Sequence, residues 1–228
     1  MDEKTLLFDY PSKGVEPPVE RKLKSEIEGT ELYIFFSHSH ADHFSSDFKK
    51  FLSYPKKTHI VLSNDISQTL ITTDNESLKA KTSFTIVAPQ KLYDIGSLKV
   101  RTFLSNDEGV AFLIELDQKK IYFGGDLAKW NWPEWNQKKI DEHVYLFKKT
   151  VKQLKKETIQ VAFSNMDKRL PSWAGPIEFI EGVKPRYFVP MHTFGNEEWI
   201  DDLIDKDPKG TKDIFHYKKP GDQIRWTI

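Results

Sequence analysis

Four side chains that can bind a metal ion lie within six residues, directly after a short apolar run. Residues 32–36 are typical of a buried strand, and residues 37–43 follow with the sequence SHSHADH. In an extended backbone the side chains at i and i+2 point to the same side, so His38 and His40 can converge on one point. Buried imidazole and carboxylate groups need partners, and a divalent cation satisfies several at once. The motif therefore predicts a metal site, and its place in a loop favours an open site that admits water.

The rest of the chain reads as strands with helices between them. Apolar, β-branched or aromatic runs predict strands at residues 5–10, 32–36, 59–62, 84–87, 98–104, 110–116, 120–123, 159–163 and 186–189. Helical periodicity is clearest over 138–156, and a shorter helix is expected over 45–52. The charged residues 201–212 indicate a surface helix and loop. This pattern predicts sheets that are covered by helices.

Composition excludes several classes of protein. Cysteine is absent, which rules out disulfides, thiolate nucleophiles and cysteine-containing metal sites. Imidazole and carboxylate ligands then favour zinc, with manganese or iron as alternatives, and one or two ions are expected. The 34 basic residues balance the 34 acidic ones, so neither a general nucleic-acid partner nor a polybasic membrane anchor is expected. Without a long apolar run or a signal-peptide layout, we expect a cytoplasmic protein.

The motif resembles the HxHxDH signature of the metallo-β-lactamase superfamily, and two later segments fit the family in order. Residues 121–126, IYFGGD, resemble the strand that ends in a metal-bridging aspartate. Residues 187–192, YFVPMH, resemble the late strand that ends in the last histidine ligand. The resemblance implies an α+β fold, a four-layer αββα sandwich, in one domain over residues 1–228. It also implies a hydrolase that acts through water activated by one or two metal ions.

Carried over by position, the resemblance implies six metal ligands: His38, His40, Asp42, His43, Asp126 and His192. The first two histidines would hold one cation, and Asp42 with the last two histidines would hold the other. Asp126 would bridge the cations and position water. Asp42 would be a ligand if two cations bind and a proton acceptor if one does, so these two aspartates are the expected catalytic residues.

This chain departs from the family pattern in two places. The family normally supplies a third histidine to the first cation, but residues 103–110 contain none. Ser105 stands nearest to the missing ligand, and Asp107, Glu108 or water are the other substitutes. Family members also normally have one more strand before the one that residues 5–10 resemble, and the pattern of this sequence does not show it. Either the sequence is shortened or the sheet edge is trimmed, and a trimmed edge would favour pairing with another chain, so a homo-oligomer is an expectation.

Three further residues are candidates for substrate binding. Trp130 and Trp132 follow Asp126 closely and could wall the site, or they could simply fasten their loop to the core. Arg169 follows a predicted strand and could bind a substrate phosphate or carboxylate, or form a surface salt bridge with Asp167. For His59, His143 and His216 a structural or solvent-facing role is expected.

The sequence thus predicts a metal-dependent hydrolase of a small ester, lactone or phosphoester. No glycine-rich phosphate loop or seryl nucleophile elbow offers another chemistry. The competing hypothesis is a non-hydrolytic metal-binding protein with a depleted first site, and a homologue that binds no metal conflicts with the ligands retained in order.

Overall fold

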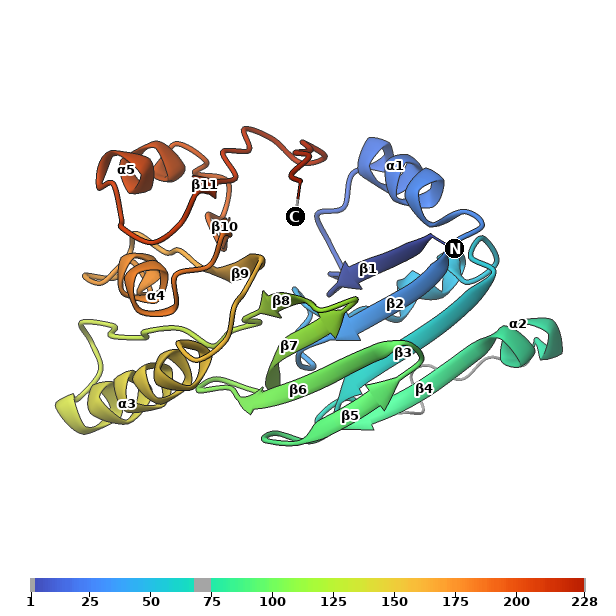
Figure 1. Cartoon of the computed structure of the whole chain (residues 1–228), viewed down its shortest axis with the longest axis horizontal. Coiled ribbons are helices and arrows are strands. Elements are labelled where there is room, and N and C mark those ends of the chain that lie inside the picture. Colours follow the sequence, from blue (N-terminus) through green and yellow to red (C-terminus); the bar gives the residue numbers. More distant parts are fainter. Residues whose placement is uncertain (1–2, 68–74, 228) are drawn as a thin grey trace.

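Two β-sheets packed face to face form the centre of the molecule, and helices cover both outer faces (Figure 1). The computed structural model describes residues 3–67 and 75–227. The layers follow the order helix, sheet, sheet, helix, so the α+β sandwich expected from the sequence is the observed architecture.

The first sheet contains four parallel strands in the order β1-β2-β3-β4. Their bounds are β1 Lys4–Phe8, β2 Glu31–Phe36, β3 Lys57–Ser63 and β4 Thr82–Val87. The connections between them contain the helix α1 (Pro17–Ile27), the 3₁₀-helix η1 (Ser46–Phe51) and the short helix α2 (Glu76–Lys81). β1 is an edge strand, and its pairing with another chain stays a prediction.

The second sheet contains seven strands in the order β11-β10-β9-β8-β7-β6-β5. Their bounds are β5 Leu92–Ile95, β6 Leu98–Leu104, β7 Val110–Leu116, β8 Lys119–Phe123, β9 Val161–Asn165, β10 Tyr187–Met191 and β11 Asp213–Ile214. β5 to β8 form an antiparallel meander, and β8 to β11 run parallel. The outer face is covered by α3 Gln137–Leu154, α4 Pro176–Val183 and α5 Trp199–Asp205.

Alternation along the strands divides the apolar side chains between three cores. On β2, Leu32 and Ile34 pack outward with α1 and η1, whereas Tyr33 and Phe35 point into the space between the sheets. On β8, Tyr122 joins the core beneath α3 and α4. Because successive residues of a strand face opposite sides, an almost wholly apolar strand can serve two cores at once.

The strand directions bring the chemically active segments to one edge of the sandwich. The parallel strands β8, β9 and β10 all end there, and the β6–β7 hairpin turns there because β7 is antiparallel to β8. The hairpin meets the first sheet at Gly109, which has φ +65°, and a Cβ added at this residue would lie 2.0 Å from the Ser37 carbonyl oxygen. Only glycine permits this backbone conformation at so close an approach.

The predicted elements differ from the observed ones in a few places. The helix expected over residues 45–52 is the 3₁₀-helix η1, Ser46–Phe51, rather than an α-helix, and the Ser45 hydroxyl accepts a hydrogen bond from the Asp47 amide as its N-cap. The helices α1, α2 and α4 and the strand β5 were not expected from the sequence pattern. Across residues 3–67 and 75–227, the helices lack the combination of length and apolarity that a membrane-spanning helix needs.

We predict that Tyr122→Phe stabilises the protein, by up to about 1 kcal/mol, because this substitution removes a buried polar group. Tyr122 is fully buried, and its hydroxyl has no hydrogen-bond partner within the described residues. The free energy of unfolding in urea measures the effect.

The matched control is Tyr33→Phe. Tyr33 is equally buried, but its hydroxyl accepts a hydrogen bond from the Ser97 amide at 3.2 Å. This variant should lose about 1 kcal/mol. A clear loss of stability in Tyr122→Phe would show that its hydroxyl is hydrogen-bonded, for example to a buried water.

Candidate metal centre

The carboxylate of Asp126, three residues after β8, faces three imidazole rings. Its Oδ2 lies 3.4 Å from Nε2 of His38, and its Oδ1 lies 3.2 Å from Nε2 of His43 and 3.4 Å from Nε2 of His192. These histidines come from the loop after β2 and from the end of β10. Asp126 therefore stands between two groups of histidines, as expected of a bridging ligand.

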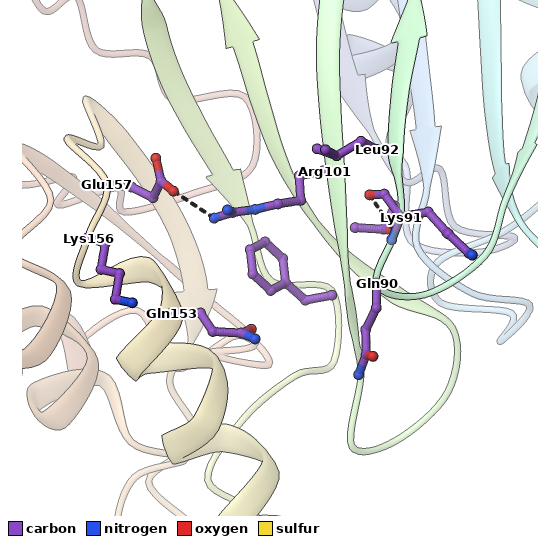
Figure 2. A pocket seen from close by; sticks show the side chains of 9 residues that line it. Gln90, Lys91, Leu92, Arg101, Gln153, Lys156 and Glu157 are labelled. Carbon is purple, nitrogen blue, oxygen red and sulfur yellow. Dashed lines mark hydrogen bonds and ion pairs between the residues drawn. The ribbon is translucent and has the colours of Figure 1, made fainter.

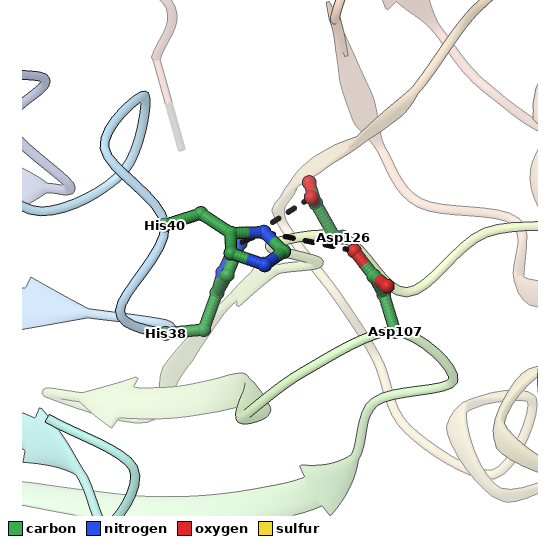
Figure 3. A group of neighbouring side chains, drawn as sticks. All are labelled: His38, His40, Asp107 and Asp126. Carbon is green, nitrogen blue, oxygen red and sulfur yellow. Dashed lines mark hydrogen bonds and ion pairs between the residues drawn. The ribbon is translucent and has the colours of Figure 1, made fainter.

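Two clusters of potential metal ligands share this aspartate. In one, ligand atoms of His38, His40, Asp107 and Asp126 all lie within 4.8 Å of one another. Figure 3 shows these four side chains turned toward one another. In the other, His43, Asp126 and His192 meet the same criterion. The structure thus groups the histidines as the family resemblance implied and adds Asp107 to the first cluster.

Asp9, which follows β1, orients two of these histidines and was missed by the sequence analysis. Its Oδ2 accepts hydrogen bonds from His43 Nδ1 at 2.6 Å and from the Ser37 hydroxyl at 2.8 Å. Its Oδ1 accepts one from the Ser37 amide at 2.8 Å. Asp9 and Ser37 are adjacent only because β1 and β2 pair in parallel, and the sequence motif gives no sign of that contact.

These hydrogen bonds fix which ring nitrogens can bind a cation. A carboxylate only accepts hydrogen bonds, so Nδ1 of His43 carries a proton. Nε2, which faces Asp126, is then the nitrogen that can bind a cation. The Ser37 hydroxyl donates its one proton to Asp9 and therefore accepts from His38 Nδ1, 3.0 Å away. Nε2 of His38 is then the ligand atom as well. Such outer hydrogen bonds commonly orient metal-binding histidines.

The β6–β7 loop brings Asp107 to the first cluster. Oδ2 of Asp107 lies 3.9 Å from Nδ1 of His40. The Ser105 hydroxyl accepts a hydrogen bond from the Asp107 amide at 3.2 Å, so this side chain shapes the loop. Glu108 lies on the outer side, with Oε2 3.4 Å from Nε2 of His40. Of the two acidic residues proposed as substitutes for the missing histidine, Asp107 joins a ligand cluster and Glu108 does not.

Asp42 lies at the open side of the second cluster but outside both groups of ligands. Its carboxylate is 67% exposed, and its Oδ2 is 3.7 Å from Nε2 of His43. Its expected roles as a ligand and as a proton acceptor stay predictions.

The charges at the centre strongly affect its titration. Burial lowers the pKa of His43, but its close contacts with the carboxylates of Asp126 and Asp9 outweigh burial and raise the pKa to about 10. Burial raises the pKa of Asp126, but the imidazoles of His38 and His43 that face its carboxylate hold this pKa well below its usual range. Burial lowers the pKa of His192, which favours the neutral ring that a cation needs.

A cavity of about 230 Å³ opens beside the second cluster. Its walls include Asp42, Asp126 and His192 together with Trp130, Trp132 and Arg169. Trp130 is 9% exposed and donates from Nε1 to the Asp126 carbonyl oxygen at 2.9 Å, so it both fastens the loop and lines the cavity. The three predicted substrate-binding residues therefore do lie at the site.

Arg169 is held rigidly at this cavity. Its Nε and Nη2 donate to the two carboxylate oxygens of the fully buried Asp167 at 2.9 and 2.6 Å. Its guanidinium lies 4.4 Å from the ring centre of Phe194 and 5.4 Å from that of Trp132. The salt bridge with Asp167 is thus present, and half of the arginine side chain remains exposed.

A separate cavity of about 380 Å³ between β6 and α3 contains none of the predicted site residues. Figure 2 shows Arg101 pointing across it to Glu157. Nη2 of Arg101 lies 2.9 Å from Oε1 of Glu157. Glu157 is also 2.6 Å from Lys120 on β8. These ion pairs tie the segment after α3 to the second sheet, which is a structural role.

The three remaining histidines lie outside both clusters. His59 is buried, with Nε2 3.0 Å from Glu31 and Nδ1 2.8 Å from the Ser83 hydroxyl. His143 lies on α3 beside Trp135, and His216 pairs with Asp201. These positions are those of structural residues.

The donor set fits a divalent cation. Nε2 of His43 and Oδ1 of Asp126 are buried and have no hydrogen-bond partner within the described residues, and they face each other at 3.2 Å across the second cluster. Buried polar atoms without partners are costly, and a cation between them would satisfy both. Imidazoles with carboxylates form a common ligand set for zinc, manganese and iron.

Solved structures support the four-layer sandwich described above, because they have the same fold. The metallo-β-lactamase fold protein YhfI from Bacillus subtilis is 13% identical, with a TM-score of 0.60 over 92% of this chain and 84% of that chain. A protein from Parabacteroides distasonis, named by inference as a metal-dependent hydrolase, is 14% identical, with a TM-score of 0.51 over 91% of this chain and 83% of that chain. No family model matches the sequence, and no curated protein matches it significantly.

We predict that Asp9→Asn weakens the binding of a divalent cation by about 10- to 100-fold, because the orientation of His43 and His38 depends on this carboxylate. Calorimetric titration of the metal-free protein with Zn²⁺ or Mn²⁺ measures the affinity. Asp94→Asn, at an exposed position on β5, is the control and should leave it unchanged. Equal affinity in Asp9→Asn would show that this network does not orient the ligands.

We also predict that cation affinity rises with pH between 6 and 8. The raised pKa of His43, about 10, means that its ring holds a second proton, on Nε2, over this range, and a cation has to displace that proton. One displaced proton gives about a tenfold gain in affinity per pH unit. Titrations with Mn²⁺ across this range, followed by electron paramagnetic resonance, measure the slope, and an affinity that does not vary with pH would contradict the prediction.

Proposed function

Since the chain has the metallo-β-lactamase fold, we propose that it is a metal-dependent hydrolase of a small ester, lactone or phosphoester. The observation that carries this proposal is the position of Asp126, whose carboxylate faces both histidine clusters beside an open cavity. A site that only stabilises a fold is normally closed by protein ligands, whereas a catalytic site keeps an open side.

The residues that would hold the cations follow from the two clusters. One cation would be held by His38, His40, Asp107 and Asp126. The other would be held by His43, His192 and Asp126, with Asp42 at the open side of this second cluster. Zinc is the favoured ion, with manganese or iron as alternatives. When bound, such an ion lowers the pKa of water and polarises a carbonyl or phosphoryl oxygen of the substrate.

The chain's own residues would place the reacting groups. Asp126 lies between the clusters and would keep the attacking water aligned with the substrate. The exposed carboxylate of Asp42, which lines the cavity, would accept the proton of that water if one cation binds, and would be a ligand if two bind. Trp130 forms a buried wall, which limits access of bulk water to this side.

Arg169 would bind an anionic group of the substrate away from the scissile bond. Its salt bridge with Asp167 and its contacts with Phe194 and Trp132 hold the guanidinium in one place, so little side-chain entropy is lost on binding. The aromatic rings beside it favour a planar or apolar group next to that anion. The small volume of the cavity, about 230 Å³, favours a small molecule.

We predict that Asp126→Asn lowers kcat/KM by at least about 100-fold on the best substrate of an ester, lactone and phosphodiester panel, because catalysis requires the carboxylate that both clusters share. Activity is measured on protein loaded with Zn²⁺ or Mn²⁺, and metal content is determined in parallel by elemental mass spectrometry. His216→Gln, outside both clusters, is the control and should keep full activity.

Three results separate the hypotheses. Activity that chelation removes and the same metal restores supports a hydrolase. Stable binding of metal without turnover of any substrate would favour the non-hydrolytic metal-binding protein instead. Full activity in Asp126→Asn would contradict the proposed site.

A further inference from the structure

The first cluster contains a second carboxylate where the family has a third histidine. His38 and His40 share this cluster with Asp107 and Asp126, so two imidazoles meet two carboxylates. The second cluster has two imidazoles and Asp126, with the carboxylate of Asp42 nearby. A histidine in place of Asp107 would instead give the first cation three imidazoles.

Asp107 is fixed in this position by its neighbour Asn106, which is 6% exposed. The Asn106 side chain accepts a hydrogen bond from the Ala128 amide at 3.1 Å and donates to the Ala128 carbonyl oxygen at 2.6 Å. It also donates to the carbonyl oxygen of His143 on α3 at 2.8 Å. These three bonds join the β6–β7 loop to the segment that follows Asp126, so both carboxylates are held in one frame.

The other side of the loop is equally constrained. The Val110 amide donates to the Ser37 carbonyl oxygen at 2.9 Å, next to His38, and Gly109 makes the close approach described above. Asp107 therefore lies between two anchored points, one beside His38 and one beside Asp126.

Glu108 completes the arrangement by orienting His40. Its Oε2 is 3.4 Å from Nε2 of His40, and the opposite nitrogen, Nδ1, faces Nε2 of His38 at 3.0 Å and Asp107. A proton held on the Glu108 side leaves Nδ1 of His40 free to bind a cation.

We propose that Asp107 is a metal ligand and that it shifts the preference of the first cation position toward Mn²⁺ or Fe²⁺, relative to a position with three histidines. The inference rests on the proposed function only in that cations bind at these clusters. Hard oxygen ligands suit Mn²⁺, whereas each imidazole adds to the advantage of Zn²⁺. Zn²⁺ still binds more tightly in absolute terms, but its margin over Mn²⁺ is reduced.

The test compares Asp107→His with the unaltered protein. Mn²⁺ binding is followed by electron paramagnetic resonance, and chelator-buffered Zn²⁺ competes for the same positions, so the readout does not depend on activity. Asp141→His adds a histidine on an exposed part of α3 and is the control. Asp107→Asn, which removes the charge but keeps the shape, is the second variant. Thermal melting of each metal-free variant checks the fold.

We expect Asp107→His to raise the Zn²⁺ over Mn²⁺ affinity ratio by about tenfold or more at one of two positions and to leave the other unchanged. Asp107→Asn should weaken Mn²⁺ at the same position by about tenfold or more. An unchanged ratio in Asp107→His, with two cations still bound, would overturn this inference and leave the proposed function intact. Absence of cation binding in the unaltered protein would overturn the proposed function itself.

Discussion

The hydrogen bonds of the Asp9 carboxylate determine the geometry of the centre. One oxygen accepts from both His43 and the Ser37 hydroxyl, and through that hydroxyl it also sets His38. Asp9 has a positive φ of 50°, at the point where β1 ends and the chain turns away. In each cluster, Asp9 therefore determines which nitrogen of one histidine can bind a cation. A change at this side chain affects both clusters together, although it lies in neither.

This arrangement requires the two sheets to approach closely at one edge. Ser37 is the contact point, since a Cβ on Gly109 or on Gly125 would lie within 3 Å of Ser37 atoms. Gly109 precedes β7 and Gly125 precedes Asp126, so these glycines bring the second sheet's ligands to the first sheet's histidines. Side chains at either position would force the sheets apart and separate Asp126 from His38. The backbone therefore places the Asp126 carboxylate between the two histidine clusters before any cation binds.

The sequence predicted those parts of the site that depend on local spacing. The alternation of His38 and His40 and the carboxylates and imidazoles at strand ends are visible in single segments, as are the apolar runs that form the sheets. Asp9 and Asn106 could not be found in this way, because their partners lie 22 to 37 residues away and depend on strand pairing and on α3. The 3₁₀ form of η1 was missed because its apolar spacing also suits an α-helix. The sequence offered Asp107 as one of several substitutes for the missing third histidine, and the fold places it beside His40.

The charges around the cavity connect cation binding to the stability of the fold. Arg169 offsets the buried Asp167, and His43 offsets Asp9 and Asp126, whereas Asp107 faces Nδ1 of His40 at the longer distance of 3.9 Å. Burial and the charge of Asp126 raise the pKa of Asp107, which means that the two carboxylates repel each other. A divalent cation between them would replace this repulsion with attraction. Because such a cation binds the folded chain and not the unfolded one, its affinity adds directly to the stability of the fold. The anchoring of the Asp107 loop by Asn106 offsets the repulsion in advance, so the ligands are already gathered when the cation arrives.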